Sequence, residues 1–60
     1  MERTVNIIGE DCIVSVHQSS RTVWVASGSI EGKHLSVKSR SANSAFRDWI
    51  AAATYRRARN

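Results

Sequence analysis

The chain has 60 residues, a formal net charge of +4 and a single cysteine. A chain of this length folds around one small core, so we expect a single domain over residues 1–60. One cysteine excludes an intramolecular disulfide, and the opening residues MERT lead into alternating sequence without the apolar region of a signal peptide. No apolar run approaches the roughly 18 residues that a transmembrane helix needs. We therefore expect a cytoplasmic protein with no membrane partner.

The positive charge is concentrated towards the C-terminal end. Residues 41–60 carry four arginines against one aspartate, whereas residues 1–40 carry five basic residues against four acidic ones. Two interpretations stay open for the final arginines. Cations in the last turn of a helix stabilise its dipole, and a basic end on a small domain is typical of proteins that bind nucleic acid or another anion.

Alternation of apolar and polar residues predicts three or four short antiparallel strands in the first two thirds of the chain. We expect them at residues 3–8, 12–17, 22–28 and 34–39, with turns at Gly9-Glu10, at Ser19-Ser20 and around Gly32. In a hairpin, the position of the turn sets the pairing. These turns would place Ile7 opposite Cys12 and Val16 opposite Val23.

The last third of the chain predicts an amphipathic helix that begins at Ala42 and frays over residues 57–60. Apolar residues recur at positions 42, 45, 46, 49, 50 and 53, which is the spacing of one helix face. Either Ser39 or Ser41 supplies the N-cap hydroxyl, and Phe46, Trp49 and Ile50 would form the main apolar contribution of the helix. The predicted fold is therefore α+β, an antiparallel meander of three to four strands with one C-terminal helix packed on one face.

The placement of Trp24 decides which face of the sheet is open. With the pairing above, one face gathers the aliphatic residues Val5, Ile7, Val14, Val16, Val23, Val25, Leu35 and Val37. If the helix covers that face, Trp24 lies on the bare one beside Ile13 and Ala26, in an apolar patch of the kind that marks interaction surfaces. In the alternative, the helix docks on the Trp24 side, where Ala26 and Gly28 allow a close approach.

The sequence contains no pattern typical of an active site or a metal site. It lacks a nucleophile elbow, a phosphate-binding glycine loop and a convincing pair of catalytic carboxylates. Cys12 and His17 fall on opposite faces of one predicted strand, which argues against a shared metal site. We therefore expect no enzyme activity, no cofactor, no metal and no small-molecule substrate, and interpret Cys12 as a small buried hydrophobe.

Basic residues near Trp24 favour a binding surface. Lysine and arginine neutralise phosphates, and an exposed ring offers a platform on which bases stack. The candidate site residues are Arg21, Trp24, Lys33, Lys38 and Arg40. Nucleic acid is the expected partner. The alternative is that the same face forms a homodimer or binds another protein.

The segment VWVASGSIEGKHLSVKSRSANSAFRDWIAAATYR resembles small DNA-binding domains built from a three-stranded antiparallel sheet and a C-terminal helix. Examples are the plant ethylene-response-factor type and the N-terminal domains of some phage and transposon integrases. The shared features are a Trp-x-Ala strand, a glycine-containing turn and an alanine-rich helix with an aromatic stripe. The resemblance implies that the bare sheet face reads the major groove through Trp24, Lys38 and Arg40, with Arg21 in support. The sheets of those domains carry more arginine at alternate strand positions than this chain does.

Overall fold

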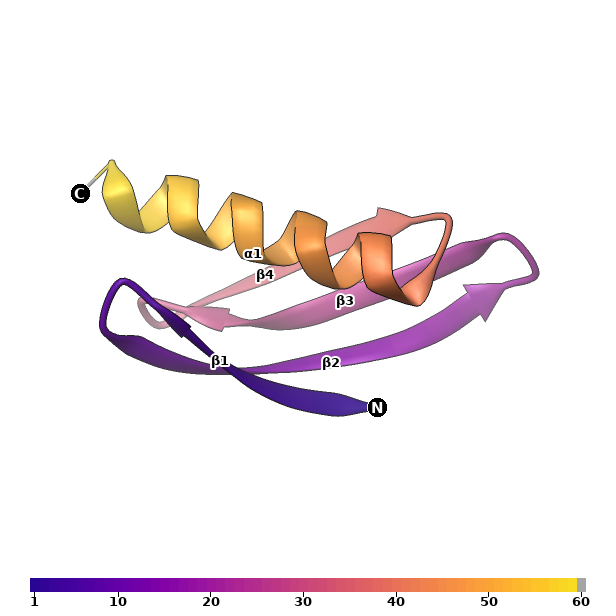
Figure 1. Ribbon diagram of the computed structural model, residues 1–60, viewed down its shortest axis with the longest axis horizontal. Helices are drawn as coiled ribbons and strands as arrows, with labels where there is room; N and C mark the ends of the chain where they lie inside the picture. The colour runs from indigo at the N-terminus through magenta and orange to yellow at the C-terminus, as the bar shows by residue number, and fades with distance from the viewer. Residues whose placement is uncertain (60) are drawn as a thin grey trace.

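The computed structural model describes residues 1–59, which form four strands and one helix (Figure 1). The elements are β1 (Glu2–Ile7), β2 (Glu10–Ser20), β3 (Val23–Ile30), β4 (Lys33–Ser39) and α1 (Ala42–Ala58). The strands form one antiparallel sheet in the order β1-β2-β3-β4, and α1 lies across one of its faces. The predicted α+β meander with a C-terminal helix is confirmed. No helix within residues 1–59 has the length and apolar character needed to cross a membrane.

Two tight turns close the outer hairpins at the same end of the sheet. Ile8 and Gly9 connect β1 to β2 with φ of 48° and 87°, and Glu31 and Gly32 connect β3 to β4 with φ of 54° and 76°. Positive φ at both central residues matches the right-handed twist of the flanking strands. Glycine adopts this conformation freely, whereas Ile8 and Glu31 do so against their Cβ atoms.

The first hairpin turns one residue earlier than expected. Ile7 lies opposite Glu10 rather than Cys12, and Cys12 lies opposite Val5. This moves each partner by two positions, and strand side chains repeat every second residue. The predicted register is therefore wrong, but the predicted faces of β1 and β2 are correct.

The second hairpin overturns the predicted faces of β3. The turn lies at Arg21-Thr22 instead of Ser19-Ser20, and Val16 lies opposite Ala26 rather than Val23. The two-residue move of the turn would by itself displace the partners by four positions and keep the faces. A β-bulge between Gln18 and Ser20 reduces the displacement to three positions, and an odd displacement exchanges the two faces of a strand. A Ser-Ser pair is a poor primed turn. Ser19 and Ser20 therefore belong to β2, and the hairpin turns after them.

Trp24 consequently faces the helix, as in the alternative, but Val14 and Val16 of β2 are buried on the same face, which the alternative would have exposed. Ala26 and Ile30 share its face and are fully buried, and Trp24 itself is half-buried against the core. Val23 and Val25 point to the opposite, open face. The expected apolar patch centred on Trp24 is therefore absent from the open face.

The core lies between α1 and the helix-facing side of the sheet, with Trp49 at its centre. Trp49 is fully buried, and its indole Nε1 donates a hydrogen bond of 2.8 Å to the carbonyl oxygen of Leu35. Gly28 leaves room for the indole, because a Cβ there would come within 2.9 Å of Trp49 Cζ2 and 2.7 Å of the Ile13 carbonyl oxygen. The other buried side chains are Ile7, Cys12, Val14, Val16, Ala26, Ile30, Ala45 and Ala53.

The predicted helix face is confirmed. Ala45, Trp49 and Ala53 form its buried line, and Phe46 and Ile50 pack half-buried beside it. The small alanines let the helix approach the sheet closely, so Trp49 alone fills the space above Gly28.

Both ends of α1 are defined within the described residues. At the start, Ser41 Oγ accepts a hydrogen bond of 3.1 Å from the Ser44 amide, so Ser41 rather than Ser39 is the N-cap. At the other end the helix continues through Ala58, beyond the predicted onset of fraying. Asn60, part of that prediction, lies outside the described residues.

Candidate nucleic-acid interface

Three of the five predicted site residues come together at one end of the sheet. Arg21 lies in the β2–β3 turn, Lys38 lies near the end of β4, and Arg40 follows β4 directly. This end of the molecule is opposite the C-terminus of α1 (Figure 1). The shallow depression that they share is lined by Arg21, Thr22, Val23, Lys38, Ser39 and Arg40.

Strand pairing explains why residues far apart in sequence meet here. Trp24 lies opposite Ser39, so the residues on either side of that pair, Val23 and Arg40, reach the same end of the sheet. Lys38 lies opposite Val25, and His17 lies on the other side of Val25. Lys38 therefore projects from the open face, with Val25 of β3 between it and His17.

The basic end is exposed and contains no neutralising group. Residues 17–22, Lys38 and Arg40 are all exposed, and no ion pair found within residues 1–59 involves Arg21, Lys38 or Arg40. None of the chain's five acidic residues lines the depression. Exposed cations without carboxylate partners stay available to an external anion.

Trp24 and Lys33 do not belong to this group, which corrects the five-residue surface. Trp24 is turned towards α1 by the register of β2 and β3 and packs against the core. Lys33 lies opposite Ile30, beside the β3–β4 turn at the other end of the sheet. Strand alternation does not reveal the β-bulge that turned Trp24 towards the helix. Lys33 borders the predicted turn around Gly32, so the predicted meander already implied its distance from Arg21 and Arg40.

The open face between these ends is polar and includes two acidic residues of the first hairpin, Glu2 and Asp11. Ser15, Ser27 and Ser36 lie in one register row across β2, β3 and β4. Ile13, with 62% of its surface exposed, is the most exposed apolar residue on this face. The four aromatic residues Trp24, Phe46, Trp49 and Tyr55 all lie on the helix side of the sheet or on the helix itself.

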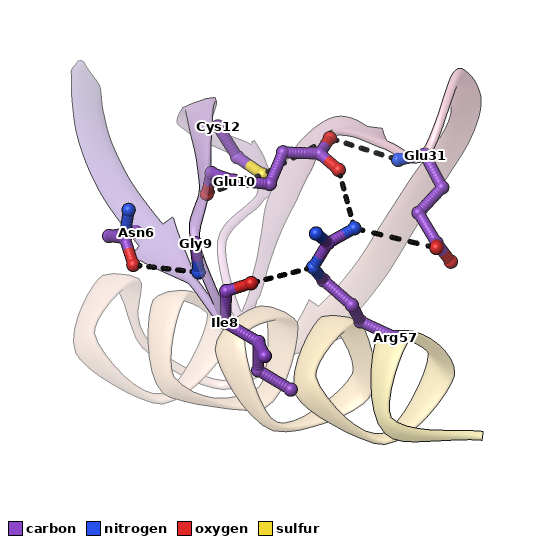
Figure 2. A network of polar contacts seen from close by, with 7 residues as sticks. All are labelled: Asn6, Ile8, Gly9, Glu10, Cys12, Glu31 and Arg57. Atoms are coloured by element: carbon purple, nitrogen blue, oxygen red, sulfur yellow. Dashed lines mark hydrogen bonds and ion pairs between the residues drawn. The ribbon is translucent and has the colours of Figure 1, made fainter. Parts of the chain in front are cut away.

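A second charged cluster anchors the C-terminus of α1, and Figure 2 shows its geometry. Arg57 Nη1 lies 3.0 Å from Glu10 Oε1 and 3.4 Å from Glu31 Oε2. Arg57 Nε also donates a hydrogen bond of 2.9 Å to the Ile8 carbonyl oxygen. The other oxygen of Glu10 accepts a hydrogen bond of 3.0 Å from the Glu31 amide. The cluster joins two turns to the helix, so Arg57 is already paired.

Sequence reasoning did not find this cluster, although a signal was present. Arg57 comes four residues after Ala53, at the next position of the buried helix line. A cation at the end of an apolar stripe requires an acidic partner where the stripe meets the sheet. Glu10 and Glu31 provide it, because both belong to the turns that meet beneath the helix C-terminus.

Cys12 has the properties of a core residue rather than a nucleophile. Its side chain is buried, and its Sγ lies 3.7 Å from the Glu10 carbonyl oxygen as a weak hydrogen-bond donor. Burial raises the pKa of the Cys12 thiol, and the negative charge of Glu10 raises it further. The reactive thiolate is therefore disfavoured. Within residues 1–59, no group of three His, Cys, Asp or Glu side chains is placed to bind a metal ion.

Comparison with known protein families, with curated proteins and with solved structures finds no match to this chain. The function therefore has to be inferred from the geometry described above.

Proposed function

We propose that this protein binds double-stranded nucleic acid, without catalysis, through the basic end of its open sheet face. The observation that carries the proposal is that Arg21, Lys38 and Arg40 line one exposed depression in which no acidic residue takes part. Phosphate contacts from such cations supply most of the affinity of non-specific nucleic-acid binding.

The part of the open face next to the basic end, on β3 and β4, suits a flat approach to a polyanion. Ser27 and Ser36 are neighbours across β3 and β4, and their row leads towards the basic end. Serine hydroxyls donate hydrogen bonds to phosphate oxygens, and small side chains let a backbone come close. Glu10 and Glu31 are kept away at the opposite end, where Arg57 neutralises them. Glu2 and Asp11 lie on the β1–β2 side of the open face, away from β4.

The distribution of aromatic residues favours a duplex over a single strand. Proteins that bind single strands stack the unpaired bases on exposed rings, at about 1–3 kcal/mol per base. The open face offers no Trp, Tyr or Phe ring, since Trp24 is packed against the core. A duplex needs no stacking platform, because its bases are already stacked. This agrees with the resemblance to sheet-based DNA-binding domains, but without the Trp24 contact that the resemblance implied.

The alternative function is that the same face forms a homodimer or binds another protein. It was based on an apolar patch around Trp24, which the open face lacks. Trp24 and Ala26 were its expected centre, and both now lie beneath the helix. Ile13, Val23 and Val25 remain on the open face, separated by serines and His17.

Fluorescence anisotropy with a labelled DNA duplex tests the proposal. The variant Arg21→Gln/Lys38→Gln/Arg40→Gln should bind much more weakly, and the slope of log K against log salt should fall by about three. A matched control, Arg47→Gln/Arg56→Gln/Arg59→Gln, has the same net charge and leaves the depression intact. Equal losses in the two variants, or no binding by the unchanged protein at low salt, would contradict the proposal.

A further inference from the structure

β4 is an edge strand that pairs only with β3. An edge strand presents a row of unpaired N–H and C=O groups, which is a template for a further strand. Peptides that add to such an edge gain affinity from main-chain hydrogen bonds and specificity from the side chains that flank it. The side chains along the β4 edge therefore indicate what kind of segment could pair there.

A groove runs between the β4 edge and the second half of α1. It is lined by Leu35, Ala52, Tyr55, Arg56 and Arg59. The guanidinium of Arg59 lies over the Tyr55 ring, 5.5 Å from its centre, and 63% of the Tyr55 surface is exposed. The groove thus combines an apolar floor with two cations and a ring along its wall.

The two arginines of the groove have no acidic partner within residues 1–59. The ion pairs found there are those of Arg57, which points to the β1–β2 and β3–β4 turns instead. No acidic residue lines the groove, and β4 itself contains two lysines and no acidic residue. The local charge is therefore positive along the whole edge.

The walls of the groove are fixed before any partner binds. Trp49 Nε1 donates its hydrogen bond to the Leu35 carbonyl oxygen at the floor. Arg57 holds the end of the helix to Ile8, Glu10 and Glu31. A preformed site loses less conformational entropy on binding.

We propose that this groove binds an extended acidic segment of another protein, which adds to the sheet as a fifth strand beside β4. Carboxylates of that segment would pair with Arg56 and Arg59, and apolar side chains between them would cover Leu35 and Ala52. A second copy of the chain is a poor occupant. Pairing two β4 edges would bring Lys33 and Lys38 of both copies together without any acidic residue in either strand. The groove lies at the other end of β4 from Arg21 and Arg40, and Arg56 and Arg59 do not line the basic depression. Variants of these two arginines therefore test this proposal separately from the proposed function, although Lys38 of β4 belongs to the depression.

Titration of the ¹⁵N-labelled protein with a peptide of alternating valine and glutamate tests this proposal. We expect shifts in the β4 amides, at residues 33–39, and in the side-chain N–H groups of Arg56 and Arg59. The double variant Arg56→Gln/Arg59→Gln should bind roughly tenfold more weakly, because two charge-assisted contacts are lost. Arg47→Gln, on the exposed side of the same helix, should bind as the unchanged protein does.

Two further peptides separate strand pairing from simple charge attraction. A valine–lysine peptide should not bind, and an acidic peptide with a central proline should bind weakly, because proline removes a main-chain donor. Equal binding of the proline peptide, or shifts confined to the Arg21 and Arg40 end, would overturn the proposal. So would shifts in β4 that appear on concentrating the protein without peptide, since they would identify a second copy as the occupant.

Discussion

Gly28 is the residue on which the packing of the helix depends most directly. Any side chain there would meet the Trp49 ring on one side and the Ile13 carbonyl on the other, at 2.9 Å and 2.7 Å from a Cβ. We expect Gly28→Ala to lower the free energy of unfolding by about 1–3 kcal/mol, the usual cost of overpacking a core. Urea denaturation measures it, with Ser27→Ala on the open face as the control. Equal stability of the two variants would mean that Trp49 can move aside.

Trp24 offers a direct test of the corrected sheet face. It is half-buried against the core, so we expect Trp24→Ser to lower the free energy of unfolding by about 2 kcal/mol, roughly half the cost of removing a fully buried aromatic. Val25→Ser, one position along and on the opposite face, should cost less. Thermal denaturation of both variants provides the comparison. The reverse order of stabilities would restore the original assignment of the faces.

Because of Cys12, we expect the stability of the protein to depend on pH in the alkaline range. Burial raises the pKa of its thiol in the folded protein, so above the pKa of an exposed thiol, about 8.5, the unfolded chain loses a proton that the folded chain keeps. The contribution of Cys12 to stability is complete below that pH and is lost as pH rises towards the folded pKa. Between neutral and alkaline pH, wild-type stability should fall more steeply than that of Cys12→Ala. If the stability of both proteins fell with pH at the same rate, the raised pKa of the Cys12 thiol would be contradicted.

At the scale of elements, the Arg57 cluster ties α1 to two hairpins. The side chains of Arg57 and Glu10 are 29% and 30% exposed, so solvent screens their attraction. A double-mutant cycle with Arg57→Gln and Glu10→Gln should give a coupling of about 0.5–1 kcal/mol that shrinks with added salt. Chemical denaturation at two salt concentrations measures it. A coupling of zero at low salt would make the cluster a consequence of packing rather than a cause.

The hairpins show which features of the strands sequence patterns determine and which features they do not. Strand alternation and helix periodicity located every element, because both depend on burial of one face. The first turn was displaced by one residue, and the faces survived because the register changed by an even number. The second turn was displaced by two residues, and a β-bulge between Gln18 and Ser20 made the register change odd, which exchanged the faces of β3. Turn chemistry as weak as Ser19-Ser20 cannot exclude such a change.

The same distinction explains which site residues could be predicted. Arg21 and Arg40 lie at strand ends, where exposure does not depend on register, and Lys38 lies on a strand whose faces were correct. Trp24 depended on the register of β3 and was placed on the wrong face. Lys33 lies beside the β3–β4 turn, at the end of β4 away from Lys38 and Arg40, which the predicted turn around Gly32 already implied.

For the molecule as a whole, the Arg57 cluster and the basic depression lie at opposite ends of the sheet. At one end, the helix C-terminus and the β1–β2 and β3–β4 turns hold Glu10 and Glu31 in ion pairs with Arg57 (Figure 2). At the other end, Arg21, Lys38 and Arg40 surround a depression without acidic residues. The stabilising cluster and the proposed binding site therefore lie at opposite ends and can be altered separately.

An amide-resolved NMR titration with a short DNA duplex, at low and at moderate salt, tests the central claim most directly. We predict shifts confined to residues 17–25 and 36–40 that weaken as salt is added, because counterion release drives the contact. Shifts centred on α1, shifts insensitive to salt, or no shifts at low salt would contradict binding through the basic end of the sheet.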